Sequence, residues 1–432
     1  MRAQREIGQY AHLERPFSTL YLLTAVFRTV SANPANDLRM NTLFVNMPPT
    51  KWISMQIAIP KETVAGENRV ALVPDSVKKL CRLGATVTIE NGAGSGAGYS
   101  DAEYEAAGAA MNSDKLAMLG AADMVLRVRK PTIEDVRQLK AGCIHVSFLD
   151  PFNEHDVVDA LKEKNISAIS MEMVPRSTRS QKMDALSSQA NLAGYVMVLK
   201  AADYLPSILA MMMTPAGTLK PAKVFIIGAG VAGLQAIATA KRLGAQVTAF
   251  DTRSEVAEQV QSVGAKFLAI DLGETGSTKD GYAKELTPEQ LQIQRDAQKE
   301  VIANSDVVIT TAQVFGRKPP VIVPKEFVAG MKPGSVVIDM AAETGGNVEG
   351  SEPGKVVEVN GVKIVGTGNW PNEVARDASQ MYSSNLFNLV EEFWDSESNK
   401  VALDFENDLI GCVITHEGAI VNQTIANLRS GG

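Results

Sequence analysis

Short apolar runs alternate with helix-like segments along most of the chain, beginning near Met55. Residues 57–59 predict a strand, residues 75–83 predict a helix that Gly84 ends, and residues 86–90 predict the next strand. The alternation continues with expected helices at 101–107, 133–139 and 153–164 and expected strands at 124–128, 144–148 and 167–170. Ser100 or Asp101 is the expected N-cap of the helix at 101–107. Strands that alternate with helices predict a parallel sheet with helices on its faces.

A second series of the same kind begins at Lys223. Its expected strands are 224–227, 247–250, 267–270, 307–310, 335–339 and 363–365, and its expected helices are 232–243 and 254–263. Two longer helix candidates, 184–205 and 378–393, precede and follow this series, and residues 401–423 are expected to return to the first domain. Residues 272–286 are polar and rich in Gly, Ser and Thr, which predicts a mobile functional loop.

This order of elements predicts an α/β protein with two Rossmann-like domains, joined by long helices with a cleft between them. The expected boundaries are 55–185 plus 375–432 for a discontinuous first domain and 186–374 for a nucleotide-binding second domain. Residues 1–54 mix arginines, acids and a short apolar run without a regular pattern. A transit peptide is usually poorer in acids, so we interpret this extension as disordered or not part of the fold.

Composition narrows the class of protein. Apolar residues make up 45% and charged residues 21% of the 432 residues, and the net charge of −7 argues against nucleic acid as a partner. The 3 cysteines form no CxxC pair and the 4 histidines show no metal-ligand spacing, so we expect neither a disulfide framework nor a metal site. The most apolar window, 224–240, contains glycines and a glutamine, which predicts a buried strand and helix start rather than a transmembrane helix.

The strongest motif is the run GAGVAG, which starts at Gly228 between an expected strand and an expected helix. Gly228 permits a tight turn, Gly230 lets the backbone approach a pyrophosphate, and Gly233 lets the helix pack close to the strand. Val231 and Ala232 open the helix, whose N–H groups and dipole then face the phosphates. The alternative is a glycine-rich turn in an ordinary α/β fold.

An acidic residue completes this pattern. Asp251 ends the next expected strand, 18 residues after Gly233, where a carboxylate can hold the hydroxyls of a ribose. That carboxylate favours NAD over NADP because it repels a 2′-phosphate. Arg253 keeps the other preference open, since an arginine at this place can bind the phosphate.

A dense polar cluster precedes the long helix at 184–205. It comprises Arg176, Ser177, Thr178, Arg179, Gln181, Asp184 and Ser187. Polar side chains at a domain junction suit a ligand pocket, and a solvated loop with Ser180 or Asp184 as helix cap explains the same pattern equally well. Tyr282, next to Gly281, either closes over a ligand or packs on the surface.

Other residues admit two interpretations. Arg69 and Glu343 are candidate site residues or members of structural ion pairs. The three methionines at 211–213 are expected to fill gaps in the core or in an interface, and His145 and His155 are expected to serve packing or the surface. No paired carboxylates or Ser-His-Asp set stands out in the sequence. Hydride transfer between two nicotinamides is compatible with this, because it needs positioning and no proton shuttle.

From Met55 to about Asn422 the chain resembles the soluble NAD(H)-binding alpha subunit, domain I, of proton-translocating NAD(P) transhydrogenase. The matching stretches are IAIPKE (57–62), PR (175–176), MD (183–184), LSSQ (186–189), NLAGY (191–195), VAGLQAIATAKRLGA (231–245), GYAKE (281–285) and MKPGS (331–335). The resemblance implies that Arg176, Gln181, Asp184 and Ser187 contact the nicotinamide, its ribose and the pyrophosphate. It further implies that Gln181 brings two nicotinamides together and that Tyr282 closes on the nucleotide. Further implied contacts are Val231, Asp251, Thr252, Arg253, Gly281 and Gln313, of which Gln313 departs from the apolar residue expected there.

The resemblance also implies an activity and partners. NADH on this chain would exchange hydride with NADP+ on a separate NADP-binding component, coupled to proton movement through a membrane domain. The chain would form a homodimer and dock from the cytoplasmic face on membrane-spanning partner subunits, without inserting into the membrane, as in the split, separately encoded type.

Two alternatives remain. One is an alanine dehydrogenase, a family whose substrate arginine matches Arg69. However, that family has a catalytic histidine where this chain has Asp150, a lysine where it has Arg127, and a catalytic aspartate where it has Glu343. Without the histidine, an acid or base for deamination is missing. The other is an NAD-sensing or structural module that has lost catalysis.

Overall fold

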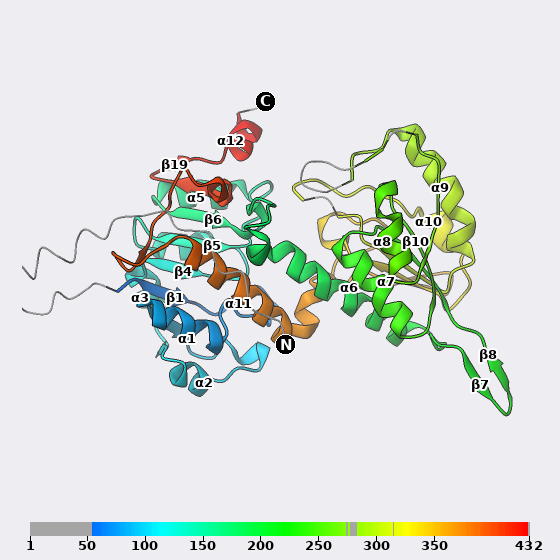
Figure 1. Cartoon of the computed structure of the whole chain (residues 1–432), viewed down its shortest axis with the longest axis horizontal. Coiled ribbons are helices and arrows are strands. Elements are labelled where there is room, and N and C mark those ends of the chain that lie inside the picture. Colours follow the sequence, from blue (N-terminus) through cyan, green and yellow to red (C-terminus); the bar gives the residue numbers. More distant parts are fainter. Residues whose placement is uncertain (1–53, 274, 277–282, 314, 431–432) are drawn as a thin grey trace, which may run out of the picture. The chain divides into compact units, whose positions relative to one another are not determined.

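The structure is a computed structural model that describes residues 54–430, apart from residues 274, 277–282 and 314. Except for Ser54, the predicted extension therefore lies outside the described residues. The described chain contains two mainly parallel sheets, each with helices on both faces (Figure 1). The predicted α/β class is confirmed by this arrangement. We call the sheets and their helices the first half and the second half of the molecule.

The first half is built on an eight-stranded sheet with the order β19-β18-β6-β5-β4-β1-β2-β3. Its strands are β1 (Gln56–Ile59), β2 (Thr86–Glu90), β3 (Ala110–Asn112), β4 (Met124–Leu126), β5 (Ile144–Ser147), β6 (Ser167–Ser170), β18 (Val413–His416) and β19 (Ala419–Ile420). Strands β1 to β6 pair in parallel, whereas β18 and β19 are antiparallel at one edge. The pairing of β18 with β6 confirms that the C-terminal segment returns to the first half.

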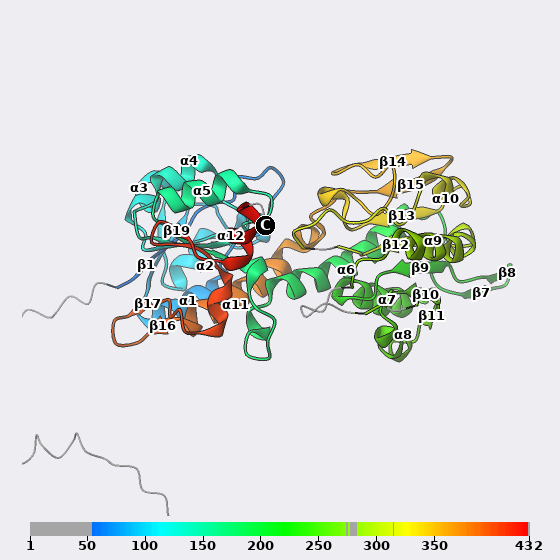
Figure 2. The ribbon, with the colours of Figure 1, turned by 90° about the horizontal axis from the view of Figure 1, so that it is seen from above.

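Helices cover both faces of this sheet (Figure 2). One face carries α1 (Pro74–Leu83), α2 (Asp101–Ala106) and α11 (Ala375–Glu392), and the other carries α3 (Lys115–Ala121), α4 (Ile133–Gln138), α5 (His155–Glu163) and α12 (Gln423–Arg429). Of the two expected caps of α2, Ser100 is the one observed, and it forms a capping box with Glu103. Gly84 ends α1 with φ 103°, as predicted.

The second half is built on a seven-stranded sheet with the order β11-β10-β9-β12-β13-β15-β14, in which only β14 is antiparallel. Its strands are β9 (Lys223–Ile227), β10 (Gln246–Phe250), β11 (Lys266–Phe267), β12 (Val307–Thr310), β13 (Val336–Asp339), β14 (Val356–Val359) and β15 (Val362–Val365). One face carries α6 (Ala185–Tyr204), α7 (Val231–Arg242) and α8 (Ala257–Ser262), and the other carries α9 (Pro288–Ala303) and α10 (Lys325–Ala329).

Two element predictions need correction. The strand expected at 267–270 is β11, which ends at Phe267 because this edge strand pairs with β10 over only two residues. The helix expected at 254–263 begins as a 3-10 turn, Ser254–Val256, before the α-helix Ala257–Ser262.

The three methionines at 211–213 are not in the core. They lie at and before a separate hairpin, formed by β7 (Met212–Thr214) and β8 (Gly217–Leu219), with exposed fractions of 61%, 51% and 82%. The prediction of a core role is therefore wrong, and the interface role stays a prediction. A second small hairpin joins β16 (Trp394–Asp395) to β17 (Lys400–Val401).

Helix α6 links the two halves because it packs closely on α7 and also contacts α11 (Figures 1 and 2). At the crossing with α7, a Cβ atom on Gly194 would lie 2.2 Å from the backbone oxygen of Ala232. Only glycine permits this approach, so α6 contacts the first turn of α7. The glycine in the NLAGY stretch therefore fixes where the linking helix meets the second half.

Candidate functional site

The glycine-rich turn follows β9 and leads directly into α7. Gly228 has φ 103°, and a Cβ atom there would lie 2.4 Å from the hydroxyl oxygen of Thr311. A Cβ atom on Gly233 would lie 1.9 Å from the backbone oxygen of Gly228. The first glycine therefore makes the turn and the third allows the helix to pack on it, in agreement with the predicted roles.

The space in front of the helix is open at the second glycine. The nearest atom to a Cβ atom built on Gly230 is Nη2 of Arg253, 4.0 Å away. Gly230 is the N-cap and has no side chain to satisfy the first N–H groups of α7, and Val231 is 42% exposed. Unsatisfied N–H groups and the positive end of the helix dipole attract an anion. The turn thus fits a phosphate group, which Gly230 leaves room to approach.

Asp251 joins the turn to the end of β10. Its Oδ2 accepts a hydrogen bond of 2.7 Å from the backbone N–H of Ala229. Arg253 donates to both carboxylate oxygens, with 2.9 Å from Nε to Oδ1 and 2.8 Å from Nη2 to Oδ2. These hydrogen bonds raise the pKa of the guanidinium group of Arg253, against the effect of burial. The two residues that pointed to opposite nucleotide preferences therefore form one ion pair beside the glycine turn.

Neighbouring strand ends contribute further polar groups. The hydroxyl of Thr252 is buried and has no hydrogen-bond partner among the described residues, while its backbone oxygen accepts a 2.7 Å bond from Thr275 in the polar loop. Gln313 is exposed beyond the end of β12. Thr311, which the sequence did not single out, holds the turn through its hydroxyl contact of 3.1 Å to the oxygen of Gly228. The signal in the sequence that could have identified Thr311 is its position directly after a buried strand.

The polar cluster before α6 surrounds a pocket of about 450 Å³. The pocket is lined by Arg176, Ser177, Thr178, Ser180, Gln181, Asp184 and Ser187. Its volume is in the range of small-molecule sites. The structure thus brings the predicted cluster together in one place, with the exception of Arg179, whose side chain instead forms ion pairs with Glu392 and Asp408.

The walls of this pocket are held by hydrogen bonds within the loop. Asp184 caps α6, because its carboxylate accepts 2.8 Å and 2.6 Å bonds from the backbone N–H and the hydroxyl of Ser187. Ser180 is buried and bonds to Ser177 and to the backbone oxygen of Pro175. Of the two expected caps, Asp184 is therefore the one observed, and Ser180 organises the loop from inside.

Residues on α11 that the sequence analysis missed anchor the same loop. The side-chain amides of Asn385 and Asn388 both donate to the backbone oxygen of Lys182, at 2.9 Å and 3.1 Å. Asn385 also accepts a 2.7 Å bond from Ser188. These contacts bridge about 200 residues of sequence, and no local pattern in the chain signals them.

Helix α6 connects the pocket to the glycine turn. Asp184 caps its start, and Gly194, ten residues later, contacts the first turn of α7. At 1.5 Å per residue the two points are about 15 Å apart along one helix. One helix therefore holds the start of α6, which lines the pocket, at a fixed spacing from the contact with α7.

Other predicted residues have structural roles or lie elsewhere. Tyr282 and Gly281 are outside the described residues. Arg69 is a member of a buried ion pair with Glu67, whereas Glu343 is exposed and lies against Gly368. His145 is buried, and burial together with the nearby charge of Arg127 lowers its pKa to about 3, so it packs as a neutral side chain, as predicted.

Two kinds of feature are absent from the described residues. No group of three or more His, Cys, Asp or Glu side chains is arranged to hold a metal ion in the part of the chain that the structure describes. None of the helices in that part combines the length and the hydropathy that a membrane crossing requires.

Comparison with known proteins gives consistent matches. Family models described as the N-terminal and C-terminal domains of alanine dehydrogenase/PNT match residues 58–193 and 197–423. An NAD(P) transhydrogenase alpha subunit of Rhodospirillum rubrum is 45% identical over 379 residues, which is 86% of this chain and 99% of that protein. The crystal structure of transhydrogenase from Sinorhizobium meliloti superimposes with a TM-score of 0.76 and 43% identity, covering 85% of this chain and 100% of that one. The alanine dehydrogenase of Halomonas elongata is 29% identical over 86% of this chain and 96% of its own length.

Proposed function

The chain belongs to the alanine dehydrogenase/PNT family and, within it, to the alpha subunits of NAD(P) transhydrogenase, and on this premise we propose that it binds NAD(H) and exchanges hydride with NADP(H) held on a partner subunit. In this proposal, membrane-spanning partner subunits couple the exchange to proton translocation, and the chain docks on them from the cytoplasmic face. The observation that carries the proposal is the pair of features on α6: a polar pocket at its start and a glycine turn against its middle.

The proposed binding mode follows from this geometry. The N–H groups at the start of α7 hold the diphosphate, since Gly230 leaves them accessible. The adenosine ribose lies at the end of β10, beside Thr252 and the ion pair of Asp251 with Arg253. Arg176, Gln181, Asp184 and Ser187 hold the nicotinamide end in the pocket.

The nicotinamide supplies the hydride donor or acceptor when bound, so the chain needs to orient it rather than to move protons. Gln181 is exposed at the pocket and can contact both this nicotinamide and one brought by the partner subunit. Asp184 keeps the pocket in place through Ser187 and the cap of α6. Orientation of two reactants in this way provides a large part of the rate enhancement in hydride transfer.

The alanine dehydrogenase alternative is less well supported. Its substrate arginine would be Arg69, but that side chain is 4% exposed and donates to Glu67, Gln189 and Asn369. A guanidinium group whose hydrogen bonds are already made inside the chain is a poor receptor for a substrate carboxylate. The identity to alanine dehydrogenase, 29%, is also lower than the 45% to the transhydrogenase subunit.

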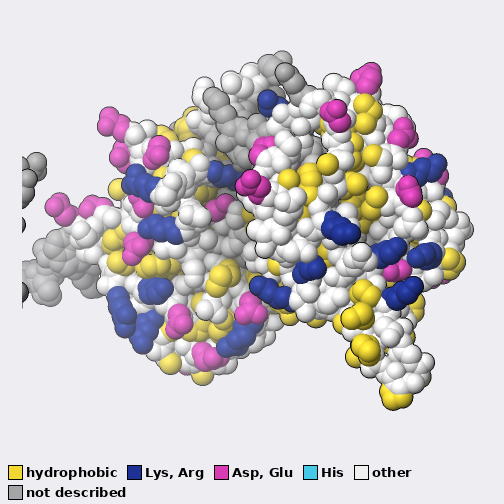
Figure 3. Space-filling view, turned by 45° about the vertical axis from the view of Figure 1, so that its right-hand side comes forward, with side chains coloured by type: hydrophobic (Ala, Val, Ile, Leu, Met, Phe, Trp, Pro, Cys, Tyr) yellow, Lys and Arg dark blue, Asp and Glu magenta, His cyan; other side chains and the backbone are white. Residues whose placement is uncertain are grey.

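The exposed methionines support a homodimer. Met211, Met212, Met213 and Leu219 are each at least half exposed on or beside the β7–β8 hairpin, where Figure 3 shows hydrophobic side chains at the surface. An isolated two-stranded hairpin is only marginally stable in water, and exposed apolar side chains mark interfaces. We infer that a second copy of the chain covers this hairpin.

The function is tested by mixing the purified chain with the NADP-binding component of a transhydrogenase and following hydride transfer from NADH to an NADP+ analogue. We expect transfer that requires both proteins. Alanine-dependent reduction of NAD+ without the partner would instead establish the dehydrogenase alternative. Binding of NADH without any transfer would support a nucleotide-sensing module.

Gln181→Ala separates orientation from binding. We expect it to slow hydride transfer by at least about 10-fold, while the dissociation constant of NADH changes by less than about 3-fold, because the side chain positions the ring and contributes little to holding the diphosphate. Lys182→Ala is the matched control, since Lys182 is the next residue, is exposed and does not line the pocket. Equal losses in transfer and binding would contradict the positioning role of Gln181.

Met213→Asp tests the homodimer. A carboxylate on the most exposed methionine of the hairpin cannot be buried in an apolar interface, so we expect sedimentation to show dissociation at concentrations where the unchanged chain is dimeric. Leu116→Asp makes the same change at a residue of α3 that is 56% exposed, and it should leave the dimer intact. A monomeric parent chain, or a dimer unaffected by Met213→Asp, would refute this interface.

A further inference from the structure

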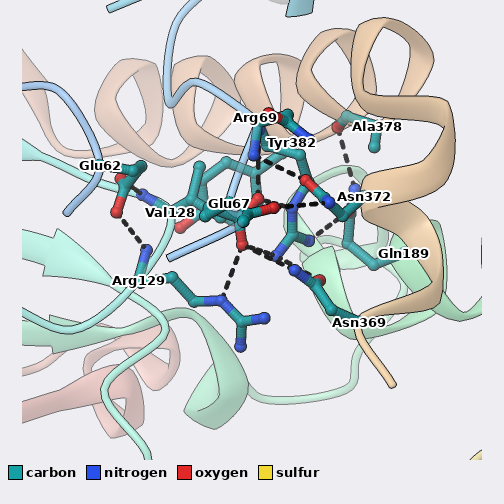
Figure 4. Close-up of polar contacts among 12 residues, drawn as sticks. Glu62, Glu67, Arg69, Val128, Arg129, Gln189, Asn369, Asn372, Ala378 and Tyr382 are labelled. Carbon is teal, nitrogen blue, oxygen red and sulfur yellow. Dashed lines mark hydrogen bonds and ion pairs between the residues drawn. The ribbon is translucent and has the colours of Figure 1, made fainter. Parts of the chain in front are cut away.

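A buried polar cluster lies where the two connections between the halves meet the first half. It is centred on Glu67, in the segment between β1 and α1, and Figure 4 shows it between α6, α11 and the residues that follow β15. The outgoing connection is α6, and the return connection runs from β15 through Asn369 to α11. A cluster at this place contacts both connections at once.

Glu67 supplies the centre of the cluster. Its side chain has 0% exposure, and its carboxylate accepts bonds of 2.7 Å from both Nε and Nη2 of Arg69, 2.8 Å from Nε of Arg129 and 3.2 Å from Nδ2 of Asn369. Burial opposes ionisation of Glu67, but the hydrogen bonds and charge of Arg69, followed by those of Arg129, lower its pKa to about 2. The carboxylate therefore stays charged and bonded throughout the neutral range.

Arg69 extends the cluster to both connections. Its Nη1 donates a 2.9 Å bond to Oε1 of Gln189 on α6, and its Nη2 donates a 3.1 Å bond to Oδ1 of Asn369 on the return connection. Gln189 in turn donates a 3.0 Å bond to the backbone oxygen of Ala378 on α11. One guanidinium group thus joins the outgoing helix to the returning segment.

The backbone of the return connection is held in an unusual conformation at this contact. Asn369 has φ 40° and ψ 42°, which lie in the left-handed region that residues other than glycine rarely adopt. Three residues later, Asn372 accepts a 2.7 Å bond from the N–H of Asn68 and donates a 2.8 Å bond to the oxygen of Gly66. Both asparagines therefore bind the segment that contains Glu67.

We propose that Glu67, Arg69, Gln189 and Asn369 form a hinge clamp that fixes the angle between the two halves and thereby orients the loop at 176–183, which lines the pocket and is anchored to α11, relative to the glycine turn. Gln189 lies on α6 between Ser187, which lines the pocket, and Gly194, which contacts α7. The clamp residues do not line the pocket and act as positioning residues for hydride transfer. This role rests on the proposed function, whereas the mechanical role of the clamp does not.

Asn369→Gly tests the clamp without straining the backbone, because glycine adopts a positive φ freely while the bonds to Glu67 and Arg69 are lost. We expect hydride transfer to fall about 10-fold, because small misplacements of reacting groups have large effects on rate, with the NADH dissociation constant changed by less than about 3-fold. Asn360→Gly is the matched control: Asn360 also has a positive φ, 50°, but lies in the exposed turn between β14 and β15. Gln189→Ala probes the same clamp from α6 and serves if Asn369→Gly folds poorly.

A distance measurement makes the test independent of nicotinamide chemistry. In a Cys81→Ser background, spin labels on Glu105→Cys in α2 and Lys299→Cys in α9, both exposed sites, report the separation of the halves. We expect Asn369→Gly and Gln189→Ala to broaden the distance distribution and Asn360→Gly to leave it narrow. Unchanged distributions in both clamp variants would overturn the proposal. Absence of transfer by the unchanged chain would instead count against the proposed function, and the distance distributions would still decide the clamp.

Discussion

The structure of the site depends on three glycines that approach neighbouring atoms more closely than a residue with a side chain would allow. At Gly228, Gly233 and Gly194, an added Cβ atom would lie 2.4 Å or less from a neighbouring atom. The contact at Gly228 sets the turn after β9 against Thr311, which follows β12. The contact at Gly233 presses the start of α7 onto this turn, and the contact at Gly194 presses α6 onto α7. Together they place a helix N-terminus with unsatisfied N–H groups beside the linking helix.

The other features of the site lie around these close contacts. The carboxylate of Asp251 supports the turn through Ala229 and at the same time neutralises Arg253, so that the end of β10 presents an ion pair rather than an isolated charge. At the other end of α6, Asp184 caps the helix and shapes the pocket. A rigid helix between an anion-binding turn and a polar pocket suits a long, two-ended ligand such as a dinucleotide.

Much of the fold could be predicted because strands and helices carry their own periodic signals. Most of the expected strands, the long α6 and α11, and the return of the C-terminal segment are confirmed, whereas β3, β14, α3 and α9 were not expected. The roles of Gly228 and Gly233 followed from local turn chemistry. The length of the edge strand β11 and the burial of the methionines at 211–213 were misjudged, because edge pairing and surface exposure depend on tertiary neighbours.

The missed features of the site are contacts between distant segments. Asn385 and Asn388 hold the loop before α6 from about 200 residues away, and Glu67 joins Arg69 to Asn369 about 300 residues away. Asn and Glu residues of this kind have no periodic signature, and a single sequence does not reveal which of them face one another. The pairing of Asp251 with Arg253 was also missed, although the two are close in sequence, because each was assigned a separate ligand role.

Calorimetric titration of the full chain with NADH, NAD+ and NADPH is the most direct measurement of whether the helix N-terminus is a dinucleotide site. We expect saturable binding of NADH and NAD+, with NADPH weaker because the ion pair with Asp251 occupies the guanidinium group of Arg253, which would otherwise be available to a 2′-phosphate. The absence of saturable heat with both NADH and NAD+ at millimolar concentration would contradict this role, because the helix N-terminus would then not hold a diphosphate.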